Sequence, residues 1–382
     1  MTFDAPQAAL LQNAAELIMV GALTVNSGFV SLNTTNIMSG VALSGGVLAF
    51  GNAGALGAGA VSVTGGELLA TASETLSNQL TFSGTSTIAA AHGTTLNENS
   101  TGYTIDGNTT LNIGSLGQDG TILWSTNSAS SILMPTTDSV EVQGGTLEAA
   151  DGNLSLLLGG AKRTTVATGG TIDVAGFSTT ISDLIGGGAI TDSGAPATLT
   201  LAAANFSGAI SGPLSLVADG AIILSGANTY TGITTIDAGD SLQLGLGGAA
   251  GSIAGGAISD DGALTIDLNN NITLTNAISG AGSLSQIGTG VTSINTGQHL
   301  CRRHDPCSWN ARHRRRQGAW VRRSDRYERR VSGDRVRDLR KQYQTLRLRQ
   351  RSDLGGRTRH DLNPDRRPYA RERQHNRRRG AR

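Results

Sequence analysis

The chain has 382 residues, with 30 Lys and Arg against 29 Asp and Glu, and a formal net charge of +1. This balance joins two unlike parts: residues 1–300 hold 2 basic and 20 acidic residues, whereas residues 301–382 hold 28 basic and 9 acidic ones. The resulting charge of −18 on the first part argues against nucleic acid and anionic membrane surfaces as partners of residues 1–296.

Residues 1–20 carry Ala, Leu and Ile at mixed spacing, which is compatible with a short helix. The segment has Asp4 and Glu16 but no basic n-region, so we expect no secretory signal in this chain. No uncharged apolar run is long enough to span a bilayer as a helix. If the protein is exported, we expect its true N-terminus to be missing from this sequence or misassigned.

Residues 21–296 consist mainly of Gly, Ala, Ser, Thr, Leu and Ile, with a single tryptophan, Trp124, and no cysteine. Short runs of alternating apolar residues recur between turn signals such as SGG, GNAG, DGN and GGG, and we expect no amphipathic helix among them. The pattern predicts many short β-strands, for example Ala22–Val25, Val41–Phe50, Ala60–Val63, Gln79–Phe82, Thr110–Ile113, Ser139–Val142 and Thr198–Leu201.

Two all-β architectures suit such strands, a sandwich or barrel and a solenoid, and internal repetition favours the solenoid. Residues 211–230 are echoed seventy residues later by residues 281–295. The matched pairs are Gly212 with Gly282, Leu214 with Leu284, Ser215 with Ser285, Gly220 with Gly290 and Leu224 with Ile294. Coils of roughly 20–25 residues would give about eleven to fourteen coils over residues 21–296, each with a narrow aliphatic core.

The clearest copy of the pattern is LSGANTYTGITTIDAGDSLQLG, residues 224–245. Its SGANTYTG turn, the Thr234–Thr235–Ile236 run and the final LQLG resemble the autotransporter-associated β-strand repeat of bacterial type V secreted proteins. One full copy carries the resemblance, and the weaker Gly-rich pattern over 21–296 is compatible with it. The resemblance implies a right-handed parallel β-helix that is displayed at the outer membrane or released from it. It also implies a C-terminal translocation barrel, which this sequence lacks.

Residues 297–382 form an Arg-rich tail without periodicity, in which Cys301 and Cys307 also lie. Three interpretations are open: a basic binding patch, a solvated disordered tail, and out-of-frame translation. In the frame one base later, the codons of Gln298, His299 and Leu300 permit Asn, Thr and Tyr, and the string can read ANTYAGGTTLAAGT. Because this copy falls at the position that the seventy-residue echo predicts, we favour a one-base slip near Thr296 and expect the tail to have no fold.

Two features suggest catalysis at first sight. The GDSL of Gly239–Leu242 matches the nucleophile block of a serine esterase family, but it lies within the repeat and precedes LQLG instead of a helix. His92 is the only histidine before the tail, and a single His in AAAHGTTL is typical of a turn. We therefore predict no catalytic residue.

Metal and phosphate sites are also not indicated. Asp219 and Asp260–Asp261 lie in Gly-containing turns that could touch Ca²⁺, but the tandem nonapeptide pattern of Ca²⁺-binding β-rolls is missing. We interpret Lys162–Arg163 as a solvated turn. The GGG of 186–188 is also predicted to be a turn, because the strand–helix unit of a phosphate cradle is missing. We predict no cofactor and no metal.

These observations favour a non-enzymatic structural or adhesive passenger stalk, exported to the bacterial cell surface, whose partner is an unidentified host or cell-surface ligand. Two alternatives stay open: a surface enzyme whose catalytic module lies outside this chain, and a non-functional product of a broken gene. The expected organisation is a short segment at 1–20, a β-solenoid at 21–296 and the Arg-rich tail at 297–382.

Overall fold

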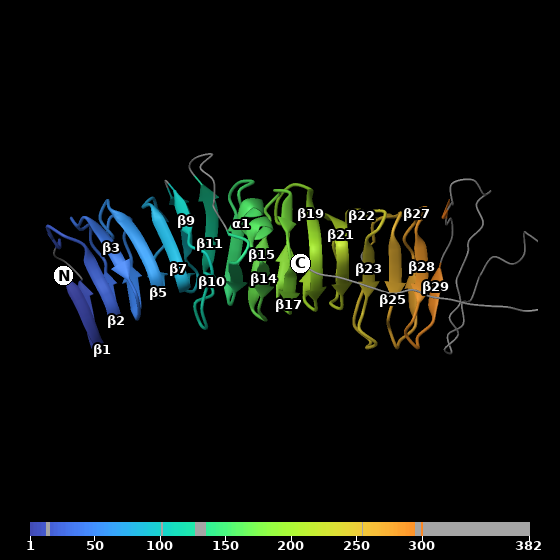
Figure 1. The fold of residues 1–382 in the computed structure, drawn as a ribbon, viewed down its shortest axis with the longest axis horizontal. Coiled ribbons are helices and arrows are strands. Elements are labelled where there is room, and N and C mark those ends of the chain that lie inside the picture. The colour runs from blue at the N-terminus through green and yellow to red at the C-terminus, as the bar shows by residue number, and fades with distance from the viewer. Residues whose placement is uncertain (13–15, 101, 127–134, 254, 295–298, 301–382) are drawn as a thin grey trace, which may run out of the picture. The chain divides into compact units, whose positions relative to one another are not determined.

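The computed structural model describes residues 1–300 except 13–15, 101, 127–134, 254 and 295–298 (Figure 1). The chain divides into two units, residues 1–322 and 323–382, and every described residue belongs to the first. The predictions for the tail at 297–382 therefore lie outside the described residues, apart from the strand His299–Leu300.

Most strands fall into three parallel stacks, in which paired strands come from successive coils. Figure 1 shows the strands following one another along the solenoid. Six bent strands contribute to both the first and the second stack: β1 (Thr2–Gln12), β2 (Leu23–Leu32), β5 (Ala60–Ala70), β7 (Leu80–Ala90), β19 (Ala197–Phe206) and β21 (Leu214–Leu224). The first stack also contains β3 (Gly40–Leu43), β9 (Tyr103–Ile105), β16 (Thr179–Ile181), β22 (Thr234–Ile236), β24 (Ile258–Asp260), β27 (Ile278–Gly280) and β30 (His299–Leu300).

The second stack also contains β4 (Val47–Phe50), β10 (Thr110–Ile113), β12 (Ser139–Val142), β14 (Arg163–Val166), β17 (Leu184–Gly186), β23 (Ser241–Leu244), β25 (Ala263–Ile266) and β28 (Ser283–Gln286). The third stack contains β6 (Glu74–Leu76), β8 (Thr95–Ser100), β11 (Thr121–Thr126), β13 (Gly145–Ala149), β15 (Gly170–Asp173), β18 (Ala189–Thr191) and β20 (Ala209–Ile210). A separate two-stranded sheet pairs β26 (Ile272–Leu274) with β29 (Thr292–Ile294).

This arrangement confirms the predicted β-solenoid, with about 14 turns. Residues of one register position follow each other from coil to coil, so that Leu48, Leu68 and Ile88 stack at intervals of 20 residues. All three side chains are fully buried. Because alternate residues of a strand point to opposite faces, one face supplies a continuous interior column and the other faces outward.

Glycines shape the bends between the first and second stacks. Gly46 has a φ of +74°, and a Cβ at this position would lie 2.3 Å from the carbonyl oxygen of Gly28 in the preceding coil. Gly66 repeats this geometry one coil later, with a φ of +78° and the carbonyl oxygen of Gly46 at 2.6 Å. Successive bends thus lie directly against one another, where a larger residue would meet both strain and a clash.

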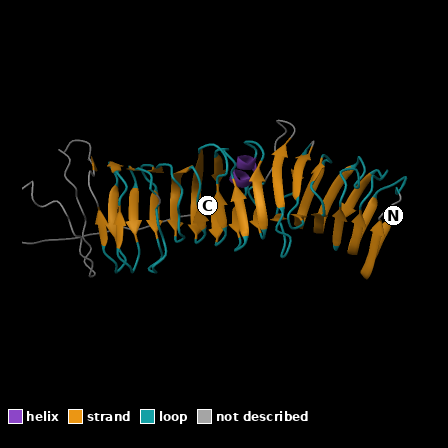
Figure 2. Cartoon of the chain, turned by 180° about the vertical axis from the view of Figure 1, so that it is seen from behind, coloured by secondary structure: helices purple, strands orange, loops and turns teal. Residues whose placement is uncertain are grey.

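The structure corrects the expectation that no helix interrupts the strands. The helix α1 (Leu154–Gly160) follows β13, and Figure 2 shows it beside the strands. It takes the place of a first-stack strand next to β16, where the Ser155 hydroxyl accepts a hydrogen bond from the Thr180 N–H at 3.0 Å. Leu154, Leu157 and Leu158 are buried at helical spacing, but a run as short as LSLLL is also compatible with a strand.

The expected helix within residues 1–20 is also wrong, because Thr2–Gln12 forms the strand β1. This strand pairs in parallel with β2 over both of its halves, with register shifts on either side of Asp4. The backbone groups of β1 find hydrogen-bond partners on the open edge of β2. A short helix of weak periodicity would have to form these bonds within itself, which is unfavourable for so few residues. Phe3 and Leu10 pack against the core.

The seventy-residue echo does not follow a single register position. Leu214 pairs with Ala197 in the first stack, whereas its sequence counterpart Leu284 pairs with Leu264 in the second. The three-dimensional repeat is instead the single coil. The echo therefore reflects similar strand-and-turn chemistry at different places in the coil, and it is a weaker guide to the position of the next copy than the sequence suggests.

Candidate functional site

The motif at 224–245 joins neighbouring coils. The side-chain oxygen of Asn228 accepts a hydrogen bond from the Ile210 N–H at 3.0 Å, and its amide nitrogen donates to the Ser252 carbonyl at 2.8 Å. The Asn228 N–H donates to the Ser252 hydroxyl at 2.7 Å. One buried amide therefore ties a coil both to the coil before it and to the coil after it.

Tyr230 and Thr234 provide a second buried contact within the motif, since their hydroxyl oxygens are 2.7 Å apart. Burial raises the pKa of Tyr230 to about 12, and the hydrogen bond with Thr234 acts in the opposite direction. Ile236, Leu242 and Leu244 are fully buried, as the repeat pattern predicts. The motif is thus an interior element of the solenoid.

The GDSL segment has the geometry of a strand. Gly239 has a φ of +107° and ends the turn, and Ser241 begins β23, where it pairs with Ala221 and Ala263. A catalytic serine of an esterase sits on a sharp turn between a strand and a helix. Ser241 is instead an outward-facing residue at the start of a strand that has a parallel neighbour on each side.

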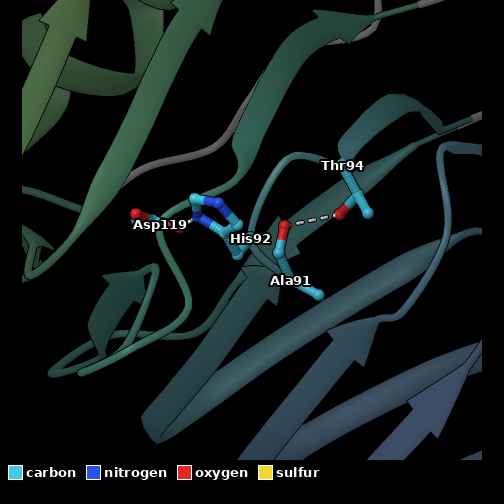
Figure 3. Close-up of polar contacts among 4 residues, drawn as sticks. All are labelled: Ala91, His92, Thr94 and Asp119. Carbon is cyan, nitrogen blue, oxygen red and sulfur yellow. Dashed lines mark hydrogen bonds and ion pairs between the residues drawn. The ribbon is translucent and has the colours of Figure 1, made fainter.

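His92 does have a partner that the sequence does not reveal. Its ring nitrogen Nδ1 lies 2.6 Å from Oδ1 of Asp119, which belongs to the corresponding corner of the next coil (Figure 3). The turn beneath is closed by the Thr94 hydroxyl, which donates to the Ala91 carbonyl at 2.7 Å, and by Gly93 at a φ of +71°.

The His92–Asp119 pair could in principle orient an imidazole for acid–base chemistry, with Nε2 pointing away from the carboxylate. The two side chains are 85% and 58% exposed, so water screens the pair and it adds little to stability. Ser241 lies many coils further along the solenoid and cannot complete a triad with it. The pair is best described as a surface tether between two corners.

The carboxyls of the Gly-containing acidic turns lie in different surroundings. Asp260 points into the interior, whereas Asp261 accepts a hydrogen bond from the Ala281 N–H at 2.8 Å and Asp219 is exposed. Within the described ranges, no three His, Cys, Asp or Glu side chains are grouped as metal ligands. Cys301 and Cys307 lie outside the described residues.

Lys162–Arg163 is more than a solvated turn, because the Arg163 Nε lies 2.8 Å from Oδ2 of Asp183, near the start of the adjacent second-stack strand β17. Within the GGG of 186–188, Gly186 ends β17, and Gly187 and Gly188 connect it to β18, so strands lie on both sides of this connection. Gly188 is tightly enclosed, since a Cβ there would lie 2.4 Å from the Ala167 carbonyl oxygen.

Sequence reasoning missed the interior placement of four carboxyls, namely Glu98, Asp138, Asp192 and Asp260, although it considered Asp260 as a turn residue. Each has one oxygen bonded to a backbone N–H and the other buried without a partner in the described structure. Burial raises the pKa of Asp260 to about 6, the Gly262 N–H lowers it and the neighbouring Asp261 adds to the rise. The signal is a carboxyl at an inward position of an alternating strand, as in the Leu96–Glu98–Ser100 series.

A further carboxyl pair lies on the outward face of the third stack, where Glu148 and Asp173 occupy one register position. Partial burial and the charge of Asp173 raise the pKa of Glu148. Asp173 is itself held by two backbone donors, the N–H groups of Ala175 and Ser193. Main-chain donors thus take the place of a cation at Asp173.

The described part of the chain thus defines a parallel β-solenoid, a class in which each coil contacts chiefly its neighbours. No family model, curated protein or solved structure matches the chain. The helix in the described residues is too short to cross a bilayer.

Proposed function

We propose that residues 21–296 are the stalk of an exported, non-enzymatic passenger region that carries or supports an adhesive surface outside a bacterial cell. The observation that carries the proposal is the role of the Leu224–Gly245 motif. Its distinctive residues, Asn228 and Tyr230, make buried contacts within and between coils, and its apolar residues fill the interior column. These are the tasks that a repeat must perform in a stacked stalk.

The solenoid interior agrees with this role. A stalk needs stability along its whole length and does not require a concave active site, and stacked coils supply this through nearest-neighbour contacts. The two features that could take part in catalysis, Ser241 and the His92–Asp119 pair, lie on different coils. A second supporting property is composition, because residues 1–300 contain no cysteine that could pair prematurely during export.

We propose further that the reading frame slips near Thr296 and that the intact gene continues the repeat and ends in a translocation barrel. Sequencing the gene across codons 290–310 and downstream tests this proposal. The expected result is an ANTYAGGTTLAAGT string in the frame one base later, followed by an open frame that encodes alternating strands. An early stop codon in that frame, or a confirmed Arg-rich tail in homogeneous native protein, would refute it.

A further inference from the structure

In the third stack, a glutamate and a tryptophan lie next to each other at interior positions. Leu76, Glu98, Trp124 and Ala149 follow each other in register on β6, β8, β11 and β13. Glu98 and Trp124 are both fully buried. The Tyr103 ring of β9 stacks on the Trp124 indole, with 4.7 Å between ring centroids. A carboxyl group is therefore enclosed between an aliphatic side chain on one side and an aromatic pair on the other.

Hydrogen bonding leaves the carboxyl of Glu98 only partly satisfied. Its Oε2 accepts a long hydrogen bond from the Ser100 N–H at 3.4 Å, whereas its Oε1 has no partner in the described structure. The Ser100 hydroxyl is engaged by the Asn78 carbonyl and the Gly102 N–H. The indole N–H of Trp124 is also buried, and it has no partner among the described residues. A carboxylate anion in this place would lack the donors that buried anions require.

Charged groups around Glu98 do not compensate it. On β6 the ionisable residue is another acid, Glu74, opposite Leu96. The strands β7 and β11 carry no ionisable side chain, and β9 carries the Tyr103 phenol, which donates to the Ser125 carbonyl at 3.3 Å. On β13, Glu148 aligns with Leu123 and so lies on the opposite face of the sheet from Trp124.

The basic residues of this part of the chain belong to another stack. Over residues 1–300 the sequence has only Lys162, which directly precedes β14, and Arg163, which begins it in the second stack. Arg163 is engaged by Asp183. Among the described residues, ionised Glu98 would thus have no counter-ion, whereas the neutral acid suits the site.

We propose that Glu98 is a pH-sensitive switch: the protonated side chain keeps the β8–β11 region closed, and loss of the proton admits water to the interior around Trp124. Burial raises the pKa of Glu98 well above its ordinary 4.5, against a smaller opposite effect of the Ser100 N–H. The closed form is therefore favoured below the ordinary value and is lost as the pH rises through the raised one.

Trp124 reports directly on this switch. Replacing Trp309 and Trp320 by Phe in the full chain leaves it as the single tryptophan of the three. Acrylamide, a neutral quencher, is then titrated against Trp124 emission between pH 4 and 9. We expect weak quenching and blue-shifted emission at pH 4, and a several-fold larger quenching constant with red-shifted emission once Glu98 ionises.

The variants Glu98→Gln and Glu98→Leu should both keep Trp124 protected across the whole range, because neither can ionise. Leu matches the residue at the same interior position in the preceding coil, which provides a folded comparison if Gln disturbs the site. Two matched controls, Asp219→Asn at an exposed carboxyl and Asp260→Asn at a distant interior one, should retain the parental response of Trp124. An unchanged pH response in either folded Glu98 variant, or no response of the parent between pH 4 and 9, would overturn the proposal.

Discussion

The closely stacked glycine bends allow a direct test of how the coils are held together. Gly46 and Gly93 have nearly the same backbone conformation, with φ values of +74° and +71°. They differ in space: a Cβ on Gly46 would meet the Gly28 carbonyl oxygen at 2.3 Å and the Ser27 carbonyl carbon at 2.7 Å, whereas a Cβ on Gly93 would meet nothing within 4 Å. Comparing the single variants Gly46→Ala and Gly93→Ala therefore separates conformational strain from the clash between coils.

The expected magnitudes follow from these two contributions. Gly93→Ala adds only the cost of a left-handed alanine, about 1–2 kcal/mol of unfolding free energy. Gly46→Ala adds the same cost and forces the backbones of two coils apart, a further 1–3 kcal/mol or so by analogy with overpacked cores. We expect Gly46→Ala to be the more destabilising variant by at least about 1 kcal/mol.

Urea unfolding of the full chain, followed by far-ultraviolet circular dichroism, measures the difference. The parent and both variants should show β-structure, and the unfolding midpoint should fall most for Gly46→Ala. Equal midpoints for the two variants would refute the close stacking of the bends. A larger loss for Gly93→Ala would refute it as well.

Three further predictions concern the coil joints, the interior acids and the surface. Asn228→Ala should lower the unfolding free energy by about 2–3 kcal/mol, because it leaves buried backbone groups of two coils unpaired. Asn205→Ala at an exposed position should be near neutral, and equal losses in urea melts would contradict the role of Asn228 in joining the coils. The pKa of Asp260 is about 6 in the folded protein against an ordinary 3.8, so the protonated carboxyl stabilises the fold fully below pH 3.8, and this stabilisation is lost as the pH rises through 6. Asp260→Asn should remove about 3 kcal/mol of this pH dependence of the unfolding free energy, and Asp219→Asn should leave it intact. Trypsin should leave a protected fragment that ends just beyond residue 300, since Lys162–Arg163 is the only basic point before the tail; rapid cleavage at that point would show that β14 is not held in the solenoid.

The regular part of the solenoid could be predicted from the sequence because its physics is local. Alternation at Leu242 and Leu244 requires only that one strand face be buried, and the structure buries both. The expected strands Thr110–Ile113 and Ser139–Val142 are β10 and β12. Glycine-rich turns between such strands suit a sandwich or barrel as well as a solenoid, and internal repetition favours the solenoid.

What could not be predicted depends on contacts between coils. The helix α1 replaces a strand because Leu154, Leu157 and Leu158 fill the interior at that coil, and short apolar runs do not distinguish a strand from a helix. The strand β1 forms because β2 offers it a partner. The similarity of Leu214 to Leu284 gives no indication that the two occupy different stacks.

The polar features depend still more on three-dimensional register. His92 and Asp119 are 27 residues apart, and only the alignment of successive corners brings them together. Glu98 and Trp124 become neighbours in the same way, through the pairing of β8 with β11. A polar residue at an inward position can be noticed in the sequence, but its burial and its lack of a counter-charge cannot.

The most direct test of the central proposal is the location of the solenoid in cells that carry the gene in its restored frame. Antibodies against residues 21–296 should label intact cells, and proteinase K added outside should remove the signal while a periplasmic marker survives. A matched gene without the downstream barrel frame should lose surface labelling. Solenoid that is digested only after the cells are lysed would contradict an exported stalk.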